Sequence, residues 1–180
     1  MNHTTRTRCG EPANFSNTDR MKATKIIAID PDVTKSGVAV MNIVSRVINT
    51  YSLSFPELMD FLSSIKIEEK ESIVVAVEAG WLNKPNWHFA KSIAIAGSIG
   101  NDVGRNHETG RKIVEMCEHL ELSVSLVKPL VKRWKGANRK ITHRELESVL
   151  KGLKMTLVKK RTNQDERDSI MIAIYKYDTL

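Results

Sequence analysis

The sequence has few cysteines, no long apolar segment, no internal repeat and no low-complexity tract. Only two of its 180 residues are cysteines, Cys9 and Cys117, and they form no metal-binding or redox spacing. This favours a reduced intracellular compartment, and we expect a cytoplasmic protein. No apolar run approaches the roughly 20 residues that a membrane span needs, so we expect no membrane partner. Residues 1–24 are polar and turn-rich, which predicts a flexible tail rather than a signal peptide.

Positive charge is concentrated in one part of the chain. The net charge is +7, but residues 128–161 hold 12 Lys or Arg against only Glu145 and Glu147, so the rest of the chain is slightly acidic. A basic segment of this kind suits a polyphosphate such as nucleic acid, although a solubilising surface is the alternative. Trp134 in this segment is either a stacking ring or a core residue.

The length suits one folded domain, residues 25–180, after the tail. Apolar and β-branched patterns predict five strands, at 25–29, 37–43, 46–54, 72–78 and 122–127. The first three are joined by short turns and should form an antiparallel meander, whereas 72–78 reads as a strand buried on both faces. Predicted helices cover 55–67, 87–103, 109–120, a segment opened by the Thr142/Glu145 capping box, and 164–177. The fold class is therefore α/β, with a mixed sheet flanked by helices.

Two of these strands end on a carboxylate, Asp30 and Glu78. Asp165 and Asp168 lie three residues apart at the start of the last helix and so share one of its faces. Ile172 and Tyr175 continue that face, which should turn both aspartates toward the body of the protein. Each acid has a simpler explanation, since Asp-Pro opens turns and helix N-termini favour acids. Neither explanation accounts for two acids on a buried helix face.

Four carboxylates gathered in one place would repel one another unless cations lay between them. Oxygen ligands without His or Cys select Mg²⁺ or Mn²⁺. The acids therefore predict a metal site.

These acids carry a resemblance to a known family. With Ile29-Asp30-Pro31, Glu78 and the Asp165/Asp168 pair, the chain resembles RuvC-type Holliday junction resolvases of the RNase H-like superfamily, including phage and viral members. The stretch VKPLVKRWKGANRKITHREL resembles the family's Pro-x-x-Val-Lys segment, and Lys132 and Lys140 take its lysine places. The similarity extends from about residue 25 to residue 175.

The resemblance implies an RNase H-like fold with a mixed five-stranded sheet. It also implies a homodimer that cuts four-way DNA junctions by hydrolysis with two Mg²⁺ ions, for which Mn²⁺ can substitute. Asp30, Glu78, Asp165 and Asp168 would be the catalytic and metal-binding residues, and Trp81 would wedge into the junction. The residues expected to bind DNA are Trp81, Lys84, Lys128, Lys132, Arg133, Lys135, Arg139 and Lys140.

The sequence also departs from this family. Asp32 stands where glycine is usual, either as a turn residue or as a fifth acid, and the segment 136–140 is short. A phosphate turn of the actin-like kind would need two such domains, for which the chain is too short. Two alternatives remain, another RNase H-like nuclease acting on RNA–DNA hybrid or other branched substrates, and a junction-binding protein without catalysis.

Overall fold

The computed structural model describes residues 23–65, 67–70, 72–83 and 93–180. The predicted flexible tail falls almost wholly in residues 1–22 and, like Lys84 and the expected helix start at Trp87, lies outside the described residues. In the part of the chain that the structure describes, no helix combines the length and apolarity needed to cross a membrane.

A mixed six-stranded sheet forms the centre of the molecule, in the order β5-β4-β1-β2-β3-β6. Strands β1, β2 and β3 form the antiparallel meander, and β4 and β5 run parallel to β1. The predicted architecture is thus confirmed, with one addition, because β6 pairs two residues with β3 and is too short to leave a sequence pattern. The strands are β1 (Lys25–Asp30), β2 (Ser36–Asn42), β3 (Val47–Leu53), β4 (Ile73–Glu78), β5 (Ser123–Val127) and β6 (Thr156–Leu157).

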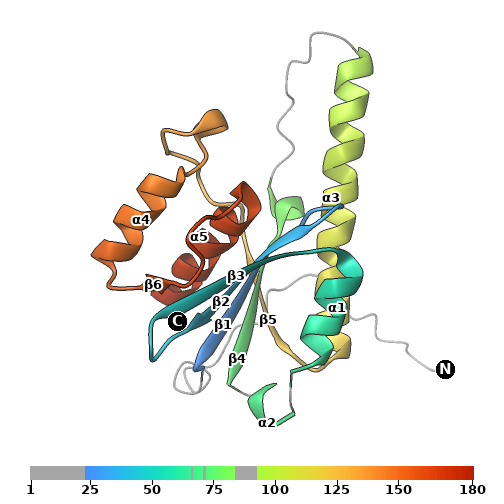
Figure 1. Cartoon of the computed structure of the whole chain (residues 1–180). Coiled ribbons are helices and arrows are strands. Elements are labelled where there is room, and N and C mark those ends of the chain that lie inside the picture. The colour runs from blue at the N-terminus through green and yellow to red at the C-terminus, as the bar shows by residue number, and fades with distance from the viewer. Residues whose placement is uncertain (1–22, 66, 71, 84–92) are drawn as a thin grey trace, which may run out of the picture.

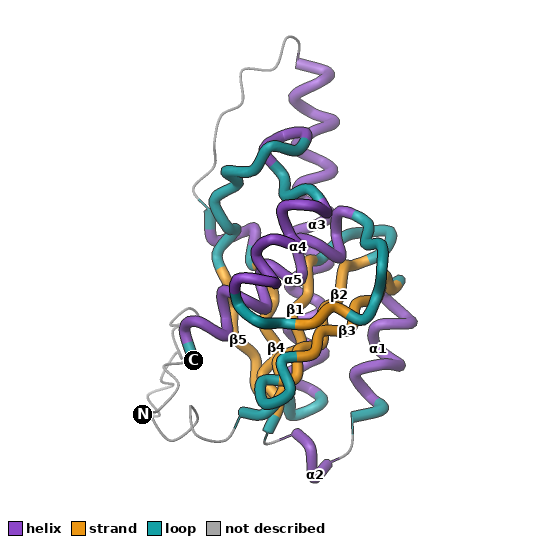
Figure 2. Tube along the Cα trace, turned by 60° about the vertical axis from the view of Figure 1, so that its left-hand side comes forward, coloured by secondary structure: helices purple, strands orange, loops and turns teal. Residues whose placement is uncertain are grey.

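Helices cover both faces of this sheet (Figure 1). Alternate residues of β1 point to opposite faces, as they must in a strand. Ile26 and Ala28 pack in the cluster under α4 and α5, whereas Ile27 and Ile29 pack in the cluster under α1 and α3. Figure 2 shows the same two layers from another side. The helices are α1 (Phe55–Ser63), α2 (Ile67–Lys70), α3 (Ile93–His119), α4 (His143–Gly152) and α5 (Gln164–Thr179).

The predicted break between two helices at residues 104–108 is wrong, because α3 runs through it as one helix of 27 residues. Glycine inside a helix costs only about 1 kcal/mol, and no proline interrupts the segment. Tertiary contact also holds this part of the helix in place, since Asn106 Oδ1 accepts a hydrogen bond of 3.2 Å from the Val33 amide. The first helix is shorter than predicted and ends at Ser63.

Candidate functional site

The four predicted acids line one hollow at the end of the sheet where strands β1 and β4 finish. Asp30 and Glu78 end the parallel neighbours β1 and β4, whose register pairs Ile29 with Val77 and so brings both strand ends to the same level. Asp165 and Asp168 enter the same hollow from the first turns of α5. Its empty space is about 740 Å³, part of it open to solvent. The topology therefore gathers acids that lie far apart in the sequence.

These carboxylates disturb one another electrostatically. The pKa of Asp30 is raised well above its ordinary value, first by burial and then by the charges of Glu78, Asp168 and Asp165. Burial also raises the pKa of Asp165, and the Lys140 ammonium opposes both increases. A bound cation would relieve this repulsion.

Lys132 and Lys140, the two lysines that the sequence assigned to the site, lie beside Asp168. The ammonium groups of Lys140 and Lys132 lie 3.2 and 3.9 Å from Asp168 Oδ2. Burial alone would lower the pKa of Lys140, but the ion pair with Asp168 raises it. On the other side, Gln164 Nε2 donates a 2.8 Å hydrogen bond to Asp168 Oδ1, so both carboxylate oxygens have partners.

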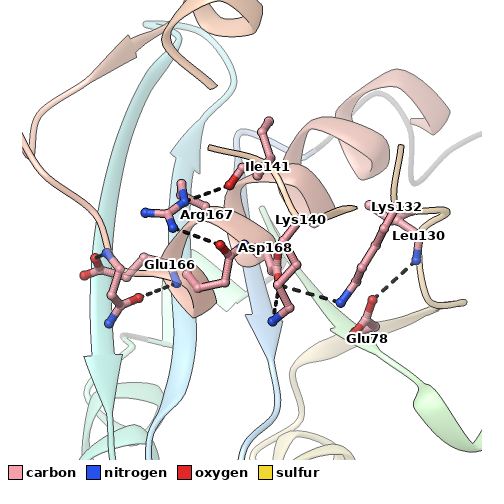
Figure 3. A network of polar contacts seen from close by, with 10 residues as sticks. Glu78, Leu130, Lys132, Lys140, Ile141, Glu166, Arg167 and Asp168 are labelled. Atoms are coloured by element: carbon pink, nitrogen blue, oxygen red, sulfur yellow. Dashed lines mark hydrogen bonds and ion pairs between the residues drawn. The ribbon is translucent and has the colours of Figure 1, made fainter. Parts of the chain in front are cut away.

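A network of polar contacts joins α5 to the basic segment (Figure 3). Arg167 donates to the Ile141 carbonyl at 3.0 Å and to Gln164 Oε1 at 2.8 Å. At the other end of the segment, the Leu130 amide donates to Glu78 Oε1 at 3.4 Å. Residues 130–141 therefore contact Glu78 of β4 as well as Arg167 and Asp168 of α5.

The start of α5 lies unusually close to β2. Gly37 is the β2 residue paired with Asp30, and a Cβ on it would lie 2.1 Å from the carbonyl oxygen of Asp165. Asn163 and Glu166 form a reciprocal capping box, with hydrogen bonds of 2.8 Å in each direction. Gly37 and this cap together fix how far Asp165 and Asp168 stand from Asp30.

The remaining predicted basic residues follow Lys132 and Lys140 along the same loop. Lys128, Arg133, Lys135 and Arg139 are all exposed there. Trp134 is partly buried and packs against the core cluster, which bears out the core interpretation of this ring.

Trp81 lies in a short 3-10 helix (Gly80–Leu82) that begins two residues after Glu78, and it lines the acidic hollow. Its ring packs against α3, where a Cβ at Gly110 would lie 2.6 Å from it, and the Arg111 guanidinium lies 5.5 Å from its centroid. The ring is therefore held in place in the wall of the hollow.

Sequence reasoning missed two polar side chains of the hollow, those of Asn106 and His107 of α3. A Cβ at Gly80 would lie 2.9 Å from two ring atoms of His107, so the imidazole lies directly against the segment after Glu78. The false helix break at 104–108 hid them, and an unbroken helical reading would have placed both on α3. Asp32 also lines the hollow, while its Oδ1 accepts a 2.8 Å hydrogen bond from the Thr34 amide as a turn residue does.

The predicted buried face is wrong at one position. Ile172 is buried, but Tyr175 is 46% exposed, because the buried stripe of α5 runs through Glu166, Ser169, Ile170 and Ala173, and Tyr175 lies off that stripe. The prediction holds for Asp168, whose side chain is only 16% exposed.

The four predicted acids offer only hard carboxylate oxygens of the kind that Mg²⁺ and Mn²⁺ prefer, so their chemistry fits these ions. Within the described ranges, no three His, Cys, Asp or Glu side chains already converge on a single metal position.

No protein-family model and no curated protein sequence matches the chain. Among solved structures, RuvC from Thermus thermophilus aligns with a TM-score of 0.49 and 14% identity, covering 86% of this chain and 95% of that one. The same protein in complex with Holliday junction substrate aligns with a TM-score of 0.45 and 14% identity, covering 87% and 94%. At this identity the likeness concerns the fold alone.

Proposed function

We propose that the protein is a metal-dependent endonuclease of the RuvC type that cuts branched DNA, the four-way junction in particular, by phosphodiester hydrolysis. One observation supports this most strongly, namely that β1, β4 and α5 place four carboxylates around one hollow with Lys132 and Lys140 beside it. Enzymes that cleave phosphodiesters use carboxylates to hold metal ions and lysine ammonium groups to stabilise the charge on the phosphate.

Asp30, Glu78, Asp165 and Asp168 would hold two Mg²⁺ ions, with Mn²⁺ as a substitute. When bound, the ions would activate the attacking water and stabilise the charge on the leaving 3′ oxygen. Lys132 and Lys140 would turn from Asp168 toward the scissile phosphate and neutralise its negative charge. Gln164 would keep Asp168 in place through its hydrogen bond to Oδ1.

The exposed cations of the basic loop would hold the DNA arms through their phosphates. Trp81 would offer the unpacked side of its ring to a base at the crossover, since α3 supports the other side. The full set proposed to bind DNA is Trp81, Lys84, Lys128, Lys132, Arg133, Lys135, Arg139 and Lys140. We also infer a cytoplasmic location.

A homodimer is part of the proposal, because a four-way junction presents two symmetry-related strands. The N-terminal half of α3 extends beyond the sheet (Figure 1). On this half, a Cβ at Gly97, Gly100 or Gly104 would meet no other atom within 4 Å, and Val103 is 46% exposed. This half-helix would pack against a second copy.

The test is incubation with synthetic four-way junction, duplex and RNA–DNA hybrid, with and without Mg²⁺. We expect cleavage of the junction only, dependent on Mg²⁺, and lost in Asp30→Asn, Glu78→Gln, Asp165→Asn and Asp168→Asn. Junction binding should survive in these variants, because removing an acid reduces repulsion of phosphates.

Asp178→Asn, at the exposed far end of α5, is the matched control and should cut normally. Preferred cutting of the hybrid would favour another RNase H-like nuclease. Tight junction binding without any cutting would favour a non-catalytic binding protein.

A further inference from the structure

The first turn of α5 carries a buried carboxylate between its two predicted metal ligands. Glu166 follows Asp165 directly, and its side chain is 0% exposed. Because successive helix residues are rotated by about 100°, Glu166 lies on another face of α5 than Asp168. In Figure 3, Asp168 lies toward Lys140, whereas Glu166 lies on the side away from it. A carboxylate buried in this way is costly unless a cation pairs with it.

Lys159 is the cation that pairs with Glu166. Its ammonium group donates to Glu166 Oε1, and the Asn163 amide donates to Oε2 at 2.8 Å, so both carboxylate oxygens have donors. Lys159 follows Val158, whose amide donates to the Ile48 carbonyl of β3 at 3.0 Å. The ion pair therefore joins the start of α5 to the side of the sheet that β3 and β6 form.

Two other capping boxes occur in the described part of the chain, and neither has a buried glutamate. Glu57 of α1 is exposed, and Glu145 of α4 is half-buried. Neither of these helices carries any of the four predicted acids. A glutamate that only caps a helix can therefore stay near the surface. Full burial against a lysine distinguishes the cap of the helix that carries Asp165 and Asp168.

The ion pair and the contact with Gly37 act on the same turn of α5. Gly37 lets this turn approach β2 closely, since a Cβ there would lie 2.9 Å from the Glu166 amide nitrogen. The attraction between Lys159 and Glu166 maintains that close approach. Without the ammonium group, Glu166 would have to turn toward water, and the first turn of α5 would move with both of its aspartates.

Building on the proposed nuclease function, we propose that Lys159 is a positioning residue for the metal site. Its ion pair with Glu166 holds the first turn of α5 where all four acids can share the metal ions. Lys132 and Lys140 line the acidic hollow, whereas Lys159 lines a separate hollow beside β6. Lys159 acts on the acids only through Glu166.

The first test measures metal binding without DNA. Mn²⁺ is titrated into the wild type, Lys159→Met, Lys159→Arg and Lys160→Met, and free Mn²⁺ is measured by electron paramagnetic resonance. Lys159→Met should weaken Mn²⁺ binding by about tenfold or more, because outer-shell partners have effects of this size. Lys159→Arg should stay within about threefold of the wild type, because a guanidinium keeps the ion pair. Lys160→Met, at the exposed neighbouring lysine, is the control with the same change of charge and should bind Mn²⁺ normally.

A double variant keeps the test valid even if Lys159→Met is poorly folded, which its melting temperature would reveal. Lys159→Met/Glu166→Gln removes the unpaired charge and still offers a carbonyl oxygen to the Asn163 amide. Because Lys159 acts through Glu166, the double variant should bind Mn²⁺ no more weakly than Lys159→Met. If the losses of Lys159→Met and Glu166→Gln add up in the double variant, the two residues act independently and the proposal is overturned.

The second test separates kcat from KM on a four-way junction with Mg²⁺. Lys159→Met should lower kcat by about tenfold or more and leave KM within about threefold of the wild type. Lys159→Arg should restore most of kcat. A rise in KM alone, or an equal loss in Lys160→Met, would make Lys159 a DNA contact and overturn the positioning role.

The two proposals fail separately. Weaker Mn²⁺ binding by Lys159→Met, together with no cleavage by the wild type, would remove the nuclease function and keep the positioning role. Wild-type Mn²⁺ binding and wild-type cleavage by Lys159→Met would keep the nuclease function and remove the positioning role.

Discussion

Replacing Gly37 with alanine tests whether the spacing between β2 and α5 sets the geometry of the acids. The new Cβ would lie 2.1 Å from the Asp165 carbonyl oxygen and 2.9 Å from the Glu166 amide nitrogen, and ordinary contact begins at 3.4 Å. Both close atoms belong to backbone, so no side-chain rotation can relieve the clash. The first turn of α5 must then move away from β2 by more than about 1 Å, and Asp165 and Asp168 move with it.

This displacement should affect catalysis far more than folding. Overpacking at one site costs about 1–3 kcal/mol, which lowers the melting temperature by roughly 2–12 °C in a domain of this size. Buried Ile170, Ile172 and Ala173 still anchor the body of the helix. A misplacement of about 1 Å at reacting groups can lower the rate about a hundredfold, and we expect at least that loss for Gly37→Ala.

The assay compares kcat/KM on a four-way junction with junction affinity from fluorescence anisotropy and with the melting temperature. Gly152→Ala at the end of α4 is the control, because a Cβ there meets no other atom within 4 Å. We expect Gly37→Ala to remain folded at 25 °C and to bind the junction within about threefold of the wild type. Cutting at the wild-type rate by a folded Gly37→Ala would refute the role given to this contact.

The other predictions concern electrostatics, junction opening and assembly. Without divalent cations, Asp30→Asn should raise the melting temperature at pH 8, by roughly 2–4 °C for each kcal/mol of relieved repulsion. The raised pKa of Asp30 favours its protonated form in the folded protein, so the wild type loses stability as pH rises through that pKa. Below the ordinary value of 3.8, the melting temperatures of the wild type and Asp30→Asn should therefore become equal. A difference in melting temperature that persists there would contradict this cause. Lys140→Met should lower kcat/KM about a hundredfold. It should also shift the acidic limb of the pH–rate profile to higher pH, because Lys140 lowers the pKa of Asp30 and Asp165. An acidic limb at the wild-type pH would rule out this electrostatic role of Lys140. Trp81→Ala should lose junction opening, measured by a base analogue at the crossover, whereas retained opening would leave Trp81 as a packing residue only. Light scattering at micromolar concentration should detect a dimer, and a monomer both with and without junction would count against the assembly.

The sequence predicted the elements whose signals are local. Apolar β-branched runs marked five strands, and the change from apolar to acidic residues marked Asp30 and Glu78 as strand ends. The pattern did not show that these two strands are neighbours; the parallel register of β1 and β4 in the structure brings Asp30 and Glu78 to the same level.

Features that depend on tertiary contact could not be predicted in this way. The continuity of α3 through residues 104–108 rests partly on Asn106 reaching Val33, and no local pattern records that contact. Strand β6 has two residues and carries no alternation. The exposure of Tyr175 depends on which stripe of α5 packs on the sheet, and tertiary contact selects that stripe.

The most direct test of the central claim is a single comparison of cleavage by the wild type and by Asp30→Asn on a four-way junction with Mg²⁺. The wild type should produce paired nicks with 5′-phosphate and 3′-hydroxyl ends, since water attacks phosphorus and the 3′ oxygen leaves. Asp30→Asn should bind the same junction and leave it uncut. Cutting by Asp30→Asn at a rate near that of the wild type, or no Mg²⁺-dependent cutting by the wild type, would contradict the account.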